Sequence, residues 1–226
     1  MAFSGSKCLS KAARLRPEAS LHGDEQRWTS QRSVGAAQDS PAFRAKKPVP
    51  PQPTDATMPQ PPHPPSVLTL KQIAYDDAMR LLARFGLTLT RVDDGEPIPG
   101  SYWGDCEAGI IGNTVYARSD TPVHSLLHEA CHLIVLPPER RNRVHTDATD
   151  STAEEDAVCV LQALLGDQLP GVGRARVLAD MDAWGYTFRL GSAAAYLEHD
   201  AEDAWAWLLA HGLVTSDRAL LYPPSD

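Results

Sequence analysis

Two histidines and a glutamate have a spacing that suits metal chemistry in HSLLHEACHLIVLPP, residues 124–138. His128 and His132 are four residues apart, so on a helix both imidazoles project from the same side, one turn apart. Two imidazoles so placed can fill two positions of a tetrahedral Zn²⁺ site. Glu129 follows the first histidine and can reach a water bound to the metal. There a carboxylate acts as general base and later passes the proton to a leaving amine.

The residues around this pattern favour a buried helix that could carry a metal site. The pattern alone arises by chance in roughly one chain in a hundred of this composition, so its setting matters. Thr121-Pro122 predicts the helix start, with Thr as cap, and Pro137-Pro138 predicts its end. A broad apolar stripe runs between them: Val123, Leu126, Leu127, Ala130, Cys131 and Ile134. His124, one turn earlier, is interpreted as a supporting residue, and two histidines without a metal remain the alternative.

A catalytic zinc needs a third protein ligand and leaves one position open. The next predicted helix ends at Gly166 and offers Glu154, which lies three and four residues before the apolar Ala157 and Val158. A carboxylate on a buried face needs a partner, and zinc would be one. We therefore predict Glu154 as the third ligand.

Two alternatives to this ligand stay open. Glu155 leads along the helix to Gln162 and is predicted to face solvent, as the capping-box partner of Ser151 or Thr152. His145 follows His132 by 13 residues in a polar loop, RVHTDATD. Loop histidines are usually solvated, so His145 is the weaker candidate.

Segments on either side of these helices predict a mixed α+β fold. Residues 70–85 have helical apolar spacing, residues 87–92 alternate like a strand, and residues 100–119 predict a hairpin turning at Gly112-Asn113. The hairpin leads directly into the histidine helix. Helices are also predicted over 174–184 and 201–211.

The C-terminal third contains side chains that could line a substrate cleft or stabilise a developing oxyanion. Tyr186, His199 and His211 are each able to donate a hydrogen bond to such an oxygen. The sequence does not choose among them. Asp200 is predicted to cap the last helix and Gly212 to end it.

At this point the sequence resembles a known class of enzymes. SLLHEACHLIVL followed by EEDAVCVLQALL is similar to the gluzincin type of HExxH zincin metallopeptidases, and most similar to the ImmA/IrrE-like family of bacterial and phage enzymes. The resemblance covers about residues 68–166. It implies a small zincin-like domain in which His128, His132 and Glu154 bind zinc and Glu129 is catalytic.

Composition and charge limit the partners. The chain has 226 residues, 42% of them apolar, and no apolar run approaches the ~18 residues of a membrane span. Residues 1–57 carry nine basic and five acidic side chains, whereas residues 58–226 carry 12 basic and 24 acidic side chains. An acidic body repels phosphates, so we expect neither nucleic acid nor membrane as a partner. Without a secretory signal pattern, the expected compartment is the cytoplasm.

Residues 1–65 are predicted to be a disordered, proline-rich extension, and residues 66–226 the zincin-like domain. Cys131 and Cys159 fall within helical patterns and are predicted to be small core residues. The sequence thus predicts a zinc-dependent endopeptidase that acts on a protein or peptide through a metal-activated water. The alternatives are a catalytically silent metal-binding or interaction module, an amidohydrolase for small amides, and a helical protein without metal. No oligomeric state is predicted.

Overall fold

A computed structural model describes residues 66–102, 104–149 and 151–223. The disordered extension predicted over residues 1–65 lies outside the described residues. In the described part of the chain, no helix combines the length and the apolar character that crossing a membrane requires.

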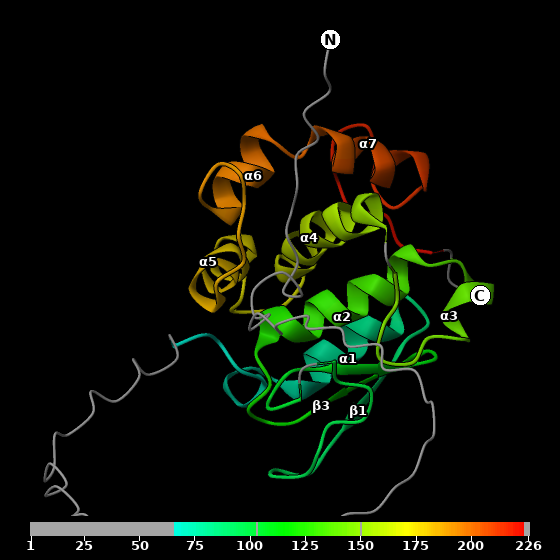
Figure 1. Ribbon diagram of the computed structural model, residues 1–226, viewed down its shortest axis with the longest axis vertical. Helices are drawn as coiled ribbons and strands as arrows, with labels where there is room; N and C mark the ends of the chain where they lie inside the picture. Colours follow the sequence, from blue (N-terminus) through cyan, green and yellow to red (C-terminus); the bar gives the residue numbers. More distant parts are fainter. Residues whose placement is uncertain (1–65, 103, 150, 224–226) are drawn as a thin grey trace, which may run out of the picture. The chain divides into compact units, whose positions relative to one another are not determined.

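The fold is mixed α+β, as predicted. The described residues form seven α-helices, one 3-10 helix and a three-stranded sheet in the order β1-β3-β2. The strands are β1 (Thr88–Arg91), β2 (Gly109–Ile111) and β3 (Thr114–Ala117) (Figure 1). β3 pairs antiparallel with β2, which confirms the predicted hairpin, and parallel with β1. Gly112 turns the hairpin at φ +57°, a left-handed conformation that glycine adopts without steric cost.

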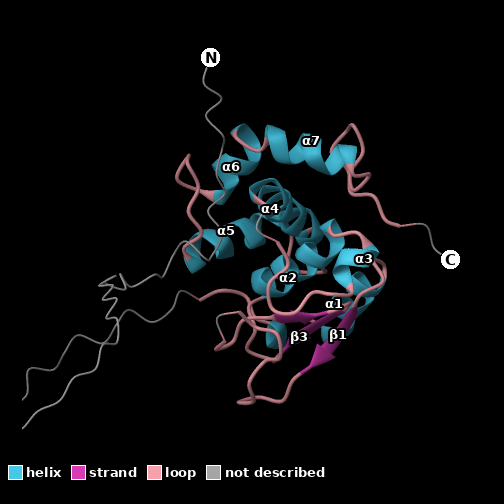
Figure 2. Ribbon diagram, turned by 45° about the vertical axis from the view of Figure 1, so that its right-hand side comes forward, coloured by secondary structure: helices cyan, strands magenta, loops and turns pink. Residues whose placement is uncertain are grey.

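The helices are η2 (Leu70–Gln72), α1 (Tyr75–Ala83), α2 (Val123–Val135), α3 (Pro138–Arg141), α4 (Thr152–Gly166), α5 (Arg174–Trp184), α6 (Ala193–His199) and α7 (Glu202–Ala210). α2 packs against α4, and α4 also contacts α5 and α7. On its other side α2 contacts β2 and β3, so it lies between α4 and the sheet (Figures 1 and 2). The histidine pattern is therefore carried by a central helix.

The helix predicted over residues 70–85 is interrupted. Its first part is the short η2, the backbone at Ile73 is extended at φ −124° and ψ 165°, and only then does α1 begin. The amide of Leu70 donates to the carbonyl of Thr121 at 2.9 Å. This long-range bond holds the segment against the start of α2.

The ends of α2 and α4 test the predicted caps. The N-cap of α2 is Pro122, and the hydroxyl of Thr121 instead accepts from the amide of Arg118 at 3.0 Å, so the Thr121 cap is wrong. Ser151 caps α4 as predicted, because its hydroxyl accepts from the amide of Glu154 at 3.4 Å. Both helices end where the sequence places their ends.

The C-terminal helices differ partly from the prediction. The helix over 174–184 is confirmed as α5, whereas α6 was not predicted. Asp200 follows α6 and pairs with Arg189, and Ala201 is the N-cap of α7. The predicted Asp200 cap is therefore wrong, because that carboxylate pairs with Arg189, which precedes α6 in the chain.

α2 is almost wholly buried. Twelve of its thirteen residues are buried, and Glu129 is the exception. A helix that is apolar or covered all round belongs to the centre of a domain rather than to its surface. Cys131 in α2 and Cys159 in α4 are both buried, which confirms their predicted core positions, and burial raises the pKa of the Cys131 thiol.

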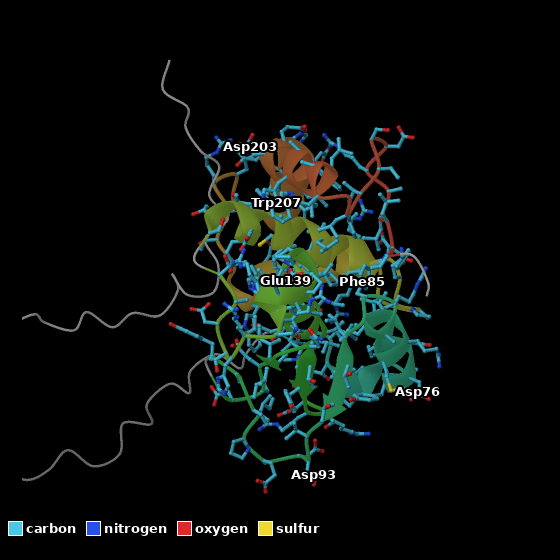
Figure 3. All side chains as sticks on the ribbon, turned by 90° about the vertical axis from the view of Figure 1, so that its right-hand side faces the viewer. Asp76, Phe85, Asp93, Glu139, Asp203 and Trp207 are labelled. Atoms are coloured by element: carbon cyan, nitrogen blue, oxygen red, sulfur yellow. The ribbon has the colours of Figure 1, made fainter. Side chains whose placement is uncertain are left out.

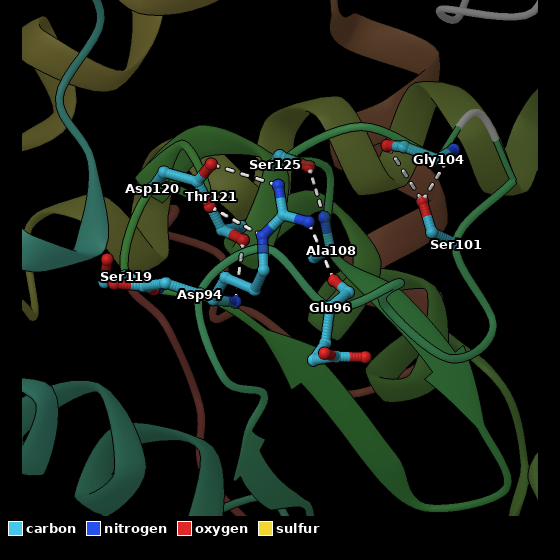
Figure 4. A network of polar contacts seen from close by, with 10 residues as sticks. Asp94, Glu96, Ser101, Gly104, Ala108, Ser119, Asp120, Thr121 and Ser125 are labelled. Carbon is cyan, nitrogen blue, oxygen red and sulfur yellow. Dashed lines mark hydrogen bonds and ion pairs between the residues drawn. The ribbon is translucent and has the colours of Figure 1, made fainter.

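A polar network fixes the entry to α2 (Figure 4). Arg118 follows β3 and pairs with Asp120, while its guanidinium also donates to the carbonyl of Glu96 at 2.8 Å. Ser125 in the first turn of α2 accepts from the amide of Ala108 at 3.2 Å. These bonds tie the loops around the hairpin to the start of the helix, and so set the position of the histidines further along.

Candidate metal centre

The two histidines of α2 point their Nε2 atoms at one another. These atoms of His128 and His132 are 3.1 Å apart, and the rings are nearly perpendicular at 86°. Both side chains are less than one-tenth exposed. Two nitrogen ligands on a tetrahedral zinc lie about 3.3 Å apart, given Zn–N bonds of about 2.0–2.1 Å. The pair therefore fits two corners of such a site.

A carboxylate from α4 completes the group. Glu155 Oε1 lies 3.2 Å from His132 Nε2, and its Oε2 lies 3.9 Å from His128 Nε2. The three side chains offer ligand atoms that are all within 4.8 Å of one another. Among the described residues this is the one group of His, Cys, Asp and Glu side chains close enough to hold a metal ion.

Gln162, two turns after Glu155 on α4, contacts the same site. Its Oε1 lies 2.8 Å from Nδ1 of His128, and the side chain is completely buried. An amide oxygen can only accept, so Nδ1 carries the proton and Nε2 presents its lone pair to the group. Support of this kind orients metal-binding histidines and selects their tautomer.

The environment of Glu155 suits a cation. Burial, first of all, and then the charges of Asp156 and Asp147 raise the pKa of the Glu155 carboxyl to about 7. A carboxylate that is desolvated and surrounded by like charge gains strongly from a nearby cation, because the cation stabilises its ionised form. With two imidazoles and one carboxylate, the donor set fits zinc.

Glu154, the predicted third ligand, lies outside this group. Its carboxylate accepts two hydrogen bonds from Arg140 of α3, at 2.6 and 3.2 Å. Burial opposes ionisation, but hydrogen bonds from Arg140 and Thr149 lower the pKa of Glu154 overall. The structure brings Glu155 to the histidines instead. Sequence reasoning turned Glu155 toward solvent because it leads to the polar Gln162, yet Gln162 is buried against His128.

Glu129, the predicted catalytic residue, is the partly exposed residue of α2. It directly follows His128 in the sequence. A general base needs both nearness to the reacting atoms and access for substrate. The position of Glu129 is compatible with that role.

His145 does not join the histidine pair. It is exposed, and its Nδ1 contacts the hydroxyl of Thr146 at 2.9 Å. Its backbone pairs with Ile111 as an extra bridge at the edge of the sheet. Its role within the described residues is therefore to extend the sheet edge.

Of the three predicted hydrogen-bond donors, Tyr186 contacts the site. Its ring lies 5.7 Å from that of His128 and 5.9 Å from that of His124, and the residue is 5% exposed. His199 is exposed, and so is His211, whose ring stacks on that of Trp207. Trp207 lies on α7 (Figure 3). Of these three side chains, the ring of Tyr186 therefore lies beside the histidine pair.

His124, Trp184 and Glu107 form a chain of contacts that starts one helical turn before His128. His124, fully buried one turn before His128, packs its ring 5.3 Å from that of Trp184. The indole of Trp184 donates to Glu107 Oε1 at 3.1 Å, and Glu107 is itself buried. Sequence reasoning missed Glu107, because its place in a loop gave no sign of burial. The supporting role predicted for His124 stays a prediction.

Comparison of the chain with models of protein families, with curated proteins and with solved structures gave no match.

Proposed function

We propose that the protein is a zinc-dependent hydrolase that cleaves peptide bonds, with His128, His132 and Glu155 as metal ligands. The observation that carries the proposal is the convergence of two buried imidazoles from α2 and one partly buried carboxylate from α4 within 4.8 Å. The resemblance of the two helical segments to gluzincin metallopeptidases supports it, with Glu155 taking the ligand position first given to Glu154. In this proposal the domain is zincin-like and the substrate is a protein or peptide.

Each remaining residue of the site has a role in this chemistry. A zinc ion bound there would polarise the substrate carbonyl and activate a water for attack. Glu129 accepts the proton of the attacking water and delivers it to the leaving amine, so the carboxylate is regenerated in each cycle. Gln162 holds His128 in the tautomer that presents Nε2. Tyr186 donates to the developing oxyanion of the substrate.

The test combines metal content with hydrolysis by the full chain. Zinc-loaded wild-type protein should cleave unfolded protein substrates, and metal-stripped protein should not. Glu129→Gln should retain zinc and lose activity by about 10²–10⁴-fold, the usual weight of a general base. Glu198→Gln is the matched control, because this exposed glutamate also neighbours a histidine.

The alternatives give different results. A silent metal-binding module would hold zinc, and Glu129→Gln would change none of its properties. An amidohydrolase would cleave small amides and leave unfolded proteins intact. A wild-type chain without stoichiometric metal would contradict the proposal as a whole.

A further inference from the structure

A second carboxylate, that of Glu154, is held by an arginine and lies near enough to His132 for the two side chains to interact electrostatically. Glu154 directly precedes Glu155 in the first turn of α4, and its side chain is only 12% exposed. The guanidinium of Arg140 in α3 donates a hydrogen bond to each carboxylate oxygen of Glu154, from Nη1 to Oε1 at 2.6 Å and from Nη2 to Oε2 at 3.2 Å. Such two-pronged pairs fix the direction of a carboxylate as well as stabilising it.

A carboxylate in this place is a rival ligand. Glutamate oxygens bind zinc well, and a glutamate side chain can reach different positions by simple rotation. If Glu154 joined the three donors, four protein ligands would close a tetrahedral site. Closed four-ligand sites are structural, whereas catalytic sites keep one position for water or substrate.

We propose that Arg140 is a positioning residue that holds Glu154 out of the metal's coordination shell and so keeps the fourth position open. This inference rests on the proposed metal site and goes beyond it, because it assigns a role to a residue of α3 that touches neither metal nor substrate. The Arg140–Glu154 pair decides whether the site is open or closed.

Arg143 provides a matched control. Together with Arg140 it lines a shallow hollow of about 230 Å³, whose other lining residues are Val144, Asp147 and Ala148. Arg143 is exposed, and its side chain makes no ion pair within the described residues. Arg143→Gln therefore removes a positive charge from the same hollow without releasing a carboxylate.

The experiment uses the full chain loaded with Co²⁺ and titrated with azide, with visible absorption as the readout. Azide needs an open coordination position, so its affinity measures the openness of the site without any substrate. Arg140→Gln should weaken azide binding by about tenfold or more, within the range typical of residues that support a metal site. It should also tighten zinc binding in competition with a chelator. Arg143→Gln should resemble wild type in its azide affinity.

The double variant Arg140→Gln/Glu154→Gln isolates the cause. It should regain the azide affinity of wild type, because the released ligand is gone. Glu154→Gln alone should also resemble wild type. If Arg140→Gln does not fold, Arg140→Lys serves in its place, since lysine keeps the charge and loses the two-pronged grip; it should weaken azide binding to a smaller extent.

Two results would overturn the inference. If the wild-type chain binds Co²⁺ and the Arg140→Gln and Arg143→Gln variants bind azide equally well, the positioning role is refuted and the proposed function stays intact. A wild-type chain that binds neither Co²⁺ nor zinc would overturn the proposed function, and the inference with it.

Discussion

The pair of central helices and the C-terminal region, residues 193–222, use the same kinds of side chains in different ways. In α2, His128 and His132 are buried and direct their Nε2 atoms at one point. In the C-terminal region, His211 is exposed and stacks on Trp207 with ring centroids 3.6 Å apart. Solvent can hydrate the exposed imidazole, whereas a buried pair must find partners inside the protein.

The carboxylates of the two regions differ in the same way. Glu155 is mostly covered, and burial raises the pKa of its carboxyl to about 7. Glu198 lies 3.6 Å from its neighbour His199, yet both side chains are largely exposed. A histidine beside a glutamate is thus not enough for a metal site. Burial and convergence from two packed helices make the difference.

The largest expected effect comes from removing a buried histidine. His128→Ala should lower zinc content from about one ion per chain to none, a loss beyond the ~10–100-fold that supporting residues contribute. His211→Ala should keep the wild-type zinc content. Elemental analysis of the two purified variants measures their zinc content. Loss of zinc in both variants, or its retention in both, would contradict the difference drawn between the buried and the exposed histidine.

Next in size is the loss of a donor hydroxyl. Tyr186→Phe should lower kcat by roughly 10²–10³-fold, the weight of one oxyanion donor, without changing zinc content. Tyr222→Phe, which removes a hydroxyl donating to Gln168 at 2.7 Å in the C-terminal region, should leave kcat unchanged. Steady-state kinetics on one peptide substrate measures both. An unchanged kcat in Tyr186→Phe would remove this tyrosine from the mechanism.

A smaller effect, on zinc affinity, is expected from replacing Gln162, whose side-chain amide is buried. Gln162→Leu removes the acceptor that orients His128 and should weaken zinc binding by about 10–100-fold. Gln168→Leu, at an exposed glutamine, should leave zinc affinity unchanged. Chelator competition gives both values, and equal affinities in the two variants would show that the contact of Gln162 with His128 has no influence on the metal.

The last expected effect concerns the pH dependence of the stability of the metal-free protein. Because the folded-state pKa of Glu155 is raised from 4.5 to about 7, the fold holds this proton more tightly than the unfolded chain. The free energy of unfolding should therefore fall as pH rises from about 4.5 to 7, by at most about 3 kcal/mol, and level off above that. Denaturant unfolding at several pH values measures it. Glu155→Gln should flatten the change, and an equally steep fall in that variant would assign it to other groups.

Much of this arrangement could be predicted from the sequence because it depends on local patterns. The spacing of His128 and His132 and the prolines after α2 are local signals, and so is the serine cap of α4. The choice between Glu154 and Glu155 is not local. It depends on how α4 is rotated against α2 and on Arg140, which the chain brings in from another helix.

Polar residues in the core were the main source of error. Gln162 suggested a solvent-facing side of α4, but a buried polar side chain can equally mark a partner across the interface, here His128. The same holds for Thr121 and Asp200, whose expected capping roles are replaced by contacts with Arg118 and Arg189. Each error came from a polar side chain whose partner is distant in sequence or across a turn.

The most direct test of the central claim is the zinc content of the full chain beside Glu155→Gln and Glu154→Gln. The three-donor site predicts about one zinc per chain in the wild type and in Glu154→Gln, and none in Glu155→Gln. Loss of zinc from Glu154→Gln with retention in Glu155→Gln would contradict the ligand set, and a wild type without zinc would contradict the metal centre itself.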